Sequence, residues 1–278
     1  MPLEIPFLLM AAPNGARRTA RDHASLPMTP ETIAATAKDC LDAGAGAVHF
    51  HARDLRDGRH VLDADLNRMI LAALDQAVGE EMLKQVTTEA VGVFTPDQQM
   101  DLVRKVRPDA VSIALSELIP DDSAAVVDKA ARFLTWMKGE GILPQFILYS
   151  LADIKRFAAL RADGVIPYRP AWLQLVLGKY TTGQVSDPAD LLPLASALEP
   201  GDIWSLCAFG RHEAACILTA GALGGHARIG FENNLHLADG TIAPNNAALI
   251  RQAVRGAALL GRSIATGRQA YALLSDCR

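Results

Sequence analysis

Residues 29–54, TPETIAATAKDCLDAGAGAVHFHARD, contain one repeat of the pattern that decides the fold. Thr29 and Pro30 predict a helix start, because a capping hydroxyl precedes a first-turn proline. Ile33 and the alanines after it give this segment an apolar face of helical period. The apolar run from Ala47 to Arg53 then predicts a buried strand. Together the helix and the strand have the length of one unit of an alternating α/β fold, about 30 residues.

The same alternation continues along the whole chain and predicts eight strands. Eight such units favour a closed (β/α)8 barrel over an open doubly wound sheet. The first predicted strand is not followed by the GxGxxG turn that an open dinucleotide-binding sheet would carry. We therefore expect one α/β domain, a (β/α)8 TIM barrel over residues 1–278, with a helical extension at its C-terminal end. The predicted strands are Ile5–Ala12, Ala47–Arg53, Leu83–Glu89, Ala110–Glu117, Leu143–Ser150, Trp172–Gly178, Ile203–Phe209 and Ala227–Asn233.

Composition and charge narrow the function classes. Half of the 278 residues are hydrophobic and the formal net charge is −4, so one large core is expected and no basic surface for nucleic acid or a membrane. The first residues lack a signal-peptide pattern, and no window has the roughly 18 apolar residues of a membrane-spanning helix, which predicts a cytoplasmic protein. The four cysteines are scattered without a CxxC pair and are expected to be neither disulfides nor ligands.

His49 and His51 alternate with apolar residues in the strand expected from Ala47 to Arg53. Side chains two residues apart on a strand point to the same face, about 7 Å apart, so both imidazoles are expected to point into the barrel. Two neutral imidazoles and one carboxylate, with a position left for water or substrate, are the usual ligands of a catalytic zinc ion. Glu232 at the end of the eighth strand is the predicted carboxylate. The alternative is that both histidines are buried residues bound to main-chain carbonyls. The other histidines expected in loops or turns are His23, His60, His226 and His236.

Polar residues are frequent at the carboxyl ends of the predicted strands, where the active sites of such barrels lie. Arg228 has the same strand parity as Glu232 but starts about 13 Å below it on an extended strand, so only its long side chain would reach a metal-bound acid. Its alternative role is a buried ion pair within the barrel. The further candidates at strand ends are Asn14, Arg17, Thr87, Glu89, Ser116, Glu117 and Asn233.

Four stretches match a known family: NGAR at 14–17, LPMTPE at 26–31, DAGAGAVHFHARD at 42–54 and GGHARIGFENN at 224–234. They resemble the β-keto acid cleavage enzymes, and the likeness extends from the first predicted strand to the last. The resemblance implies a zinc-dependent barrel that takes a β-keto acid and acetyl-CoA and yields acetoacetate and an acyl-CoA. In that reaction zinc would polarise the keto oxygen while an acetyl-derived carbanion adds to the ketone, and carbon–carbon cleavage would follow a retro-Claisen route. Homodimers or homotetramers are also implied.

The resemblance assigns roles to individual residues. His49, His51 and Glu232 coincide with the family's zinc ligands, Arg228 with the arginine that holds the substrate carboxylate, and Thr87 with a hydroxyl residue near the reacting carbonyl. Asn14, Arg17, Ser116 and Asn233 are expected to contact the substrate. No residue is assigned to CoA, although the loop 179–183 and the turn 210–212 could meet its phosphates through backbone amides and charge.

Two positions depart from the family pattern. Asn233 stands where well-studied members have an aspartate thought to move the proton, and an amide cannot act as a general base. Glu89 and Glu117 are the candidates to replace it; the alternative for both is ion pairing with Arg17, Arg18 or Arg53. Arg17 stands where the enzyme for an amino-substituted keto acid has an acid, which favours a neutral or anionic substrate tail. The alternative is that Glu89 or Glu117 lines the pocket for the tail and restores a preference for positive groups.

Two other functions remain open at this point. A metal-dependent aldolase or hydrolase could use the same barrel, because His-x-His also occurs in amidohydrolase sites. A barrel that binds a keto acid or a CoA ester without turnover is the other alternative, and Asn233 supports it.

Overall fold

The eight predicted strands form a closed barrel in the computed structural model, which describes residues 4–278. All eight are parallel and hydrogen-bonded in chain order, and β8 pairs with β1 to close the ring. The predicted (β/α)8 barrel is therefore confirmed. The strands are β1 Leu9–Ala11, β2 Ala47–Phe50, β3 Leu83–Thr87, β4 Ala110–Ala114, β5 Leu143–Leu148, β6 Trp172–Leu177, β7 Ile203–Ala208 and β8 His226–Ile229.

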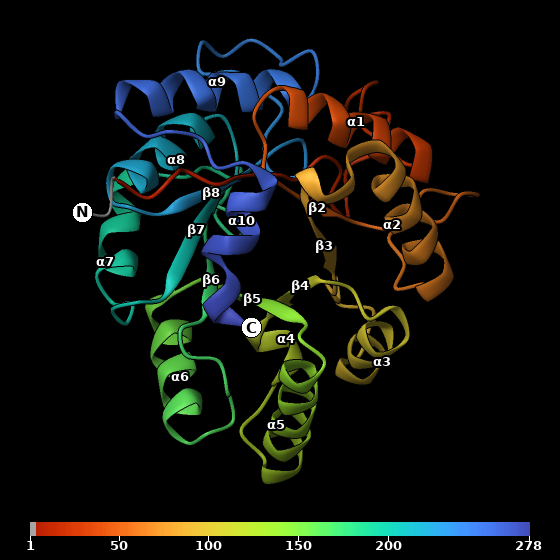
Figure 1. Ribbon diagram of the computed structural model, residues 1–278, viewed down its shortest axis with the longest axis vertical. Helices are drawn as coiled ribbons and strands as arrows, with labels where there is room; N and C mark the ends of the chain where they lie inside the picture. Colours follow the sequence, from red (N-terminus) through yellow and green to blue (C-terminus); the bar gives the residue numbers. More distant parts are fainter. Residues whose placement is uncertain (1–3) are drawn as a thin grey trace.

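Helices surround the barrel on its outer side (Figure 1). The helix start predicted at Thr29 and Pro30 is confirmed, because Thr29 forms a capping box with a proline in the first turn. Thr95 does the same, and Asn245 caps the helix that follows β8. The α-helices are α1 Pro30–Asp42, α2 Ala64–Val78, α3 Pro96–Val106, α4 Leu115–Leu118, α5 Ala124–Gly139, α6 Leu151–Ala162, α7 Leu191–Ala195, α8 Glu213–Ala222, α9 Asn246–Leu259 and α10 Gly267–Leu273; the short 3-10 helices are η2 Gly79–Glu81, η3 Pro188–Asp190 and η4 Ser275–Cys277. No helix within residues 4–278 is both long enough and apolar enough to span a bilayer.

The strands end earlier than the sequence suggests. β4 stops at Ala114 and the chain turns at once into α4, so Ser116 lies on this short helix and is exposed. His226, expected in a turn, is instead the first residue of β8 and is buried, with its Nδ1 accepting a hydrogen bond from the main-chain N–H of Leu8.

The barrel interior is filled in layers. The lowest layer is apolar and includes Leu83, Ala110, Leu143 and Trp172, which pack against the C-terminal residues around α10. This helix lies across the open end of the ring in Figure 1. Because one end of the barrel is plugged in this way, small molecules can reach its interior only from the carboxyl ends of the strands.

Above the apolar layer the interior is polar. The amide of Gln85 donates from Nε2 to Oε1 of Gln145 (3.0 Å), and both side chains are fully buried. His49 lies in the same layer, while Val48 and Phe50 face the outer helices and belong to the main apolar core. The alternation predicted for this strand is therefore confirmed.

Candidate active site

His49, His51 and Glu232 meet at the mouth of the barrel. The Nε2 atoms of the two imidazoles are 3.1 Å apart, and the Glu232 carboxylate lies 3.5 Å from each of them, through Oε2 to His49 and Oε1 to His51. One ligand atom from each of the three residues can be chosen so that all lie within 4.8 Å of one another. All three side chains are almost completely buried. A divalent cation would be within reach of all three.

Hydrogen bonding determines which nitrogen of His49 can bind a cation. Gln85 uses Nε2 to donate to Gln145, so its Oε1 is an acceptor and Nδ1 of His49, 2.8 Å away, must carry the hydrogen. Burial, together with the nearby Arg228 charge, lowers the pKa of His49 well below its ordinary value, which keeps the ring neutral. Nε2 of His49 therefore presents a lone pair toward Nε2 of His51. This donor set fits a metal ion, because two facing nitrogens and a carboxylate need a cation between them.

We expect Gln85→Leu to weaken metal binding by about 10- to 100-fold without unfolding the barrel, because an outer-shell acceptor that orients a ligating histidine has an effect of this size. Competition with a chelator of known affinity measures the change. Gln174→Leu is the matched control, since Gln174 lies in the same polar layer and bonds only main-chain carbonyls. Equal losses in both variants would show that Gln85 acts through packing alone.

The chain turn after β8 places Glu232. Gly230 has a φ of 151°, and a Cβ atom there would lie 2.3 Å from the carbonyl oxygen of Ala12. Gly15 has a φ of 63°, and a Cβ atom there would lie 2.6 Å from Cγ of Glu232. β8 ends at Ile229 and the chain turns at Gly230, so the extended strand expected through Asn233, on which the 13 Å offset rested, is wrong. Nη2 of Arg228 lies 3.4 Å from Oε1 of Glu232, a contact that the sequence expected only from its long side chain.

Arg228 is a buried cation with unused donors. Its Nη2 contacts Oε1 of Glu232 (3.4 Å) and Sγ of Cys207 (3.6 Å), whereas Nε and Nη1 have no hydrogen-bond partner within residues 4–278. Burial alone would raise the pKa of Glu232, but the charge of Arg228 is the largest of the interactions that hold it well below its usual range. A guanidinium with two idle donors beside a candidate metal centre is suited to bind a carboxylate.

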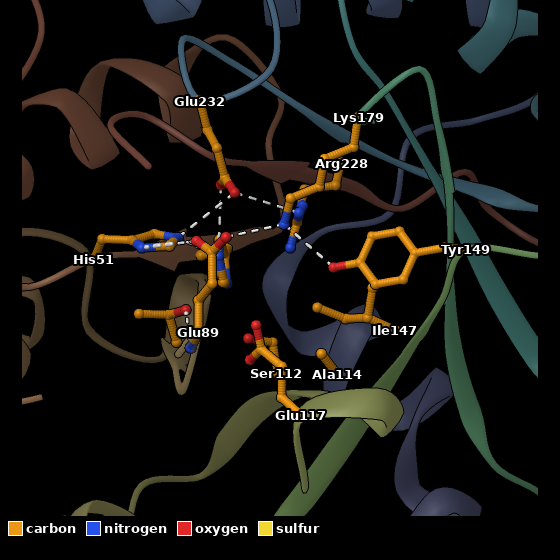
Figure 2. A pocket seen from close by; sticks show the side chains of 12 residues that line it. His51, Glu89, Ser112, Ala114, Glu117, Ile147, Tyr149, Lys179, Arg228 and Glu232 are labelled. Carbon is orange, nitrogen blue, oxygen red and sulfur yellow. Dashed lines mark hydrogen bonds and ion pairs between the residues drawn. The ribbon is translucent and has the colours of Figure 1, made fainter. Parts of the chain in front are cut away.

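Two cavities that share lining residues lie at this centre. The first has about 10 Å³ of free space and is shown in Figure 2. The second has about 80 Å³, and Glu89, Lys179 and Glu232 line both. The first is lined by His49, His51, Thr87, Glu89, Ser112, Ala114, Glu117, Ile147, Tyr149, Lys179, Arg228 and Glu232; the second by Asn14, Gly15, Ala16, Arg17, Arg18, Glu89, Lys179, Gln184, Phe209 and Glu232.

Of the two candidate acids, Glu89 is the more central. Its Oε1 accepts from Arg17 (3.2 Å) and Lys179 (2.9 Å), and its Oε2 lies 3.8 Å from Nδ1 of His51. Although burial opposes it, the charges of His51 and Lys179 lower the pKa of Glu89 to about 2. The pairing with Arg17 expected as an alternative is thus present, and it leaves Glu89 ionised inside the cavity.

Glu117 sits at the wall of the first cavity. Its Oε2 accepts from the main-chain N–H of Ala90 (2.9 Å) and from Nε2 of Gln99 (3.0 Å). Burial raises its pKa above the ordinary value. These bonds tie one carboxyl oxygen of Glu117 to the wall.

Three residues predicted to contact the substrate either lie outside the two cavities or already bond to other protein groups. Asn14 lines the second cavity, but its amide bonds both the N–H (3.1 Å) and the carbonyl (2.9 Å) of His51 and so holds that ligand in place. Ser116 lines neither cavity; Ser112, two residues earlier on β4, faces the centre instead. Asn233 is fully buried, donates to the carbonyl of Arg228 (3.2 Å) and also lines neither cavity.

The surroundings of Asn233 account for the amide at this position. Glu213, at the start of α8, is buried against the same turn, where it accepts from the N–H of Gly230 (3.3 Å) and from Nδ2 of Asn234 (3.2 Å). Burial raises the pKa of Glu213 to about 8. A carboxylate at position 233 would add a second buried acid beside Glu213, and the two would repel each other.

Lys179, Tyr149, Ser112 and Gln85 are the site residues that the sequence did not assign. Tyr149 could have been expected at the mouth of the barrel, because it directly follows β5 and the strand ends lie there. Lys179 was expected only as a possible phosphate contact, yet its ammonium bonds Glu89 and Tyr149 within the mouth. Which way a loop lysine turns depends on contacts across the barrel that a linear pattern does not contain.

Fold and site together define a (β/α)8-barrel protein with a candidate metal centre and, beside it, a buried arginine with unpartnered donor atoms within residues 4–278. The chain belongs to the beta-keto acid cleavage enzyme family, whose model matches residues 6–275. The family expected from the sequence motifs is thus confirmed.

Individual relatives agree with this assignment. The 3-keto-5-aminohexanoate cleavage enzyme of Fusobacterium nucleatum is 26% identical over 272 residues, covering 97% of each chain. The 3-oxoadipate:acetyl-CoA acetyltransferase of Cupriavidus necator is 27% identical, covering 97% of this chain and 94% of the relative. Among solved structures, a ternary complex of ObcA with a C4-CoA adduct and oxalate superposes with a TM-score of 0.73 at 17% identity, over 90% of this chain and 67% of that one, and so shares the fold. The names of these two relatives describe a keto acid cleavage enzyme and an acetyltransferase that acts with acetyl-CoA.

Proposed function

We propose that the protein converts a β-keto acid and acetyl-CoA into acetoacetate and the CoA ester of the shortened acid. The relatives' names support this reaction class, since one of them is named 3-oxoadipate:acetyl-CoA acetyltransferase. Atoms balance when the carboxymethyl carbon of the keto acid, C2, moves to the acetyl group and CoA moves to the remaining acyl group.

The observation that carries the proposal is the buried guanidinium of Arg228. Its two unpartnered donors lie beside the His49, His51 and Glu232 cluster, so one small anion could contact the arginine and the metal centre together. A β-keto acid has a carboxylate two bonds from its ketone, and its two oxygen-bearing groups fit such a paired site. A neutral ligand would leave the buried donors of Arg228 unpaired, at a cost of about 1–3 kcal/mol.

The atom balance also decides which carbon becomes the nucleophile. An acetyl-derived carbanion, as expected from the sequence, would release acetate and a β-ketoacyl-CoA, which are different products. C2 of the keto acid must instead lose a proton and bond to the acetyl carbonyl carbon, expelling the CoA thiolate. The thiolate then attacks C3, the C2–C3 bond breaks in a retro-Claisen step, and C2 regains a proton.

The residues of the cavity can be assigned to these steps. A bound zinc ion would supply Lewis-acid polarisation of the substrate oxygens. Arg228 would hold the carboxylate, and the hydroxyl of Thr87 lines the wall near the reacting carbonyl. Glu89 would remove and return the C2 proton, because it is an ionised carboxylate in both cavities whereas Asn233 lines neither.

The proposed function is tested by supplying purified, zinc-loaded protein with β-keto acids and acetyl-CoA and following acetoacetate. Acetoacetate and the new acyl-CoA should form in equal amounts, and neither should form when acetyl-CoA is omitted. Cleavage of the keto acid without acetyl-CoA would instead identify a hydrolase or an aldolase. Binding with no turnover of any acid would identify a binding barrel.

The assignment of Glu89 is tested by hydrogen exchange at C2. In deuterium oxide without acetyl-CoA, the protein should exchange the C2 hydrogens of its substrate, and Glu89→Gln should slow this by about 10²- to 10⁴-fold, the usual contribution of a general base. Glu117→Gln is the matched control and should retain exchange within a few-fold. The reverse ranking of the two variants would transfer the role to Glu117.

A further inference from the structure

Two cations share one carboxylate oxygen across the mouth of the barrel. Nη1 of Arg17 (3.2 Å) and Nζ of Lys179 (2.9 Å) both contact Oε1 of Glu89. Arg17 follows β1, Glu89 follows β3 and Lys179 follows β6, so the cluster spans the opening above the candidate metal centre. One negative charge stands against two positive charges at this place.

Lys179 makes several contacts inside the mouth although it lies on a loop. Its side chain is 11% exposed, and Nζ donates to Glu89 and to the hydroxyl of Tyr149 (3.2 Å). The ammonium also lies over the rings of Tyr149 (5.3 Å) and Tyr180 (5.8 Å). Figure 2 shows Lys179 beside Arg228, facing the space between His51 and Tyr149. An ammonium has three hydrogens, so one donor remains beyond these two bonds.

Arg17 offers more free donors. Its side chain is 59% exposed and makes a single ion pair, through Nη1 to Glu89. The guanidinium has five N–H donors in a planar fork that matches a carboxylate. Arg17 and Lys179 can therefore each keep Glu89 and still bind a second anion.

The charges that line the two cavities also favour binding of a second anion. Their walls contain four cations, Arg17, Arg18, Lys179 and Arg228, and three acids, Glu89, Glu117 and Glu232. A divalent metal ion would add two positive charges, whereas the reacting carboxylate of a simple β-keto acid contributes only one negative charge. A substrate with two carboxylates would compensate this excess more completely, and a substrate with an ammonium group would increase it.

We propose that Lys179 and Arg17 form a second anion-binding subsite that selects β-keto dicarboxylates, with the reacting carboxylate at Arg228 and the terminal carboxylate between Lys179 and Arg17. The subsite rests on the proposed function, because it defines the substrate class of the same reaction. Glu89 is already shared by the two cations, so a cationic tail would meet net positive charge there.

The test uses three six-carbon β-keto acids that differ mainly at the far end of the chain: 3-oxoadipate, 3-oxohexanoate and 3-keto-5-aminohexanoate. With the zinc-loaded protein and saturating acetyl-CoA, kcat/KM for the dicarboxylate should exceed that for the neutral acid by about 10- to 100-fold, the range for charge-assisted hydrogen bonds. 3-Keto-5-aminohexanoate, which carries an ammonium group, should be the poorest substrate. Lys179→Met should remove most of this preference, so that the ratio of kcat/KM for the dicarboxylate to kcat/KM for the neutral acid falls toward one through a higher KM for the dicarboxylate. Lys179 also bonds Glu89, so any loss that acts through Glu89 should lower kcat equally for the two acids.

Controls separate selectivity from folding and from CoA binding. Arg17→Gln, at an exposed position, should fold normally and show a smaller loss confined to the dicarboxylate. Lys38→Met removes a surface lysine of α1 that pairs with Asp42 and should change nothing. A uniform rise in the KM of acetyl-CoA in Lys179→Met, equal for every keto acid, would place the subsite at CoA and overturn the proposal. So would a wild-type preference for the neutral or the aminated acid.

Failure of the proposed reaction can be distinguished from failure of the proposed subsite. If no acid gives acetoacetate, the proposed function fails, and calorimetric binding of 3-oxoadipate and 3-oxohexanoate to the zinc-loaded wild type and Lys179→Met then decides the subsite alone. Tighter binding of the dicarboxylate that is lost in the variant would support it. Equal binding of both acids would refute it.

Discussion

His49→Ala is expected to abolish both metal binding and acetoacetate formation. The variant removes one of three ligand groups whose donor atoms lie within 4.8 Å of one another. Loss of an outer-shell partner alone costs 10- to 100-fold in affinity, so loss of a direct ligand should exceed about 10²-fold. Elemental analysis after dialysis should fall from about one zinc ion per chain to a trace.

A partner experiment shows that this loss is specific to the metal centre. His236→Ala changes a histidine that lines neither cavity and should keep both metal and activity. Far-UV circular dichroism should be unchanged in both variants, because the strand hydrogen bonds of β2 do not involve the imidazole. Full metal content in His49→Ala would mean that the cluster is not the metal site, and the proposed reaction would lose its Lewis acid.

Arg228→Met is expected to lower kcat/KM for a β-keto acid by roughly 10²- to 10³-fold while the metal content stays near that of the wild type. The pair in question is Arg228 and the substrate carboxylate. Removing one partner of a buried charge pair has an effect of this order, since in the variant the substrate carboxylate would be buried without a positive partner. Steady-state kinetics with acetoacetate as the readout measures the change. Arg228→Lys keeps the charge but not the planar fork, so an intermediate loss is expected.

The methyl ester of the same keto acid serves as the matched substrate. It lacks the carboxylate that Arg228 is proposed to hold, so wild type and Arg228→Met should treat the ester nearly alike. An equal loss for acid and ester would assign Arg228 to the alternative considered from the sequence, a buried ion pair that supports Glu232. The observed 3.4 Å contact between Arg228 and Glu232 is compatible with both roles, and only the ester comparison separates them.

Local patterns were sufficient for the architecture. The capping boxes at Thr29 and Thr95 are contained within four consecutive residues, so their geometry can be inferred from neighbours in the chain alone. The orientation of His49 and His51 depends only on the two-residue period of a strand, and the structure confirms it. The family motifs around these histidines and around Glu232 likewise predicted the three residues that the barrel brings together as a candidate metal centre.

Details at the strand ends were less predictable. The strand expected to continue to Glu117 ends at Ala114, which moves Ser116 to the surface and leaves Ser112 facing the cavity. Asn233 was expected to contact the substrate, and the turn that begins at Gly230 instead places it against Glu213. A single turn changes the direction in which the next side chains point, and a periodic pattern does not reveal where that turn occurs.

By itself the sequence determined the barrel, the inward direction of the two histidines and the family. These properties depend on periodicity and on short motifs, in which interacting residues are close together in the chain. The tertiary structure decided the rest: the approach of Glu232 to Arg228, the fixing of the His49 ring by Gln85, and the sharing of Glu89 by Arg17 and Lys179. Those contacts join residues on different strands and loops, and their distances are set by the closure of the ring and the turns after each strand.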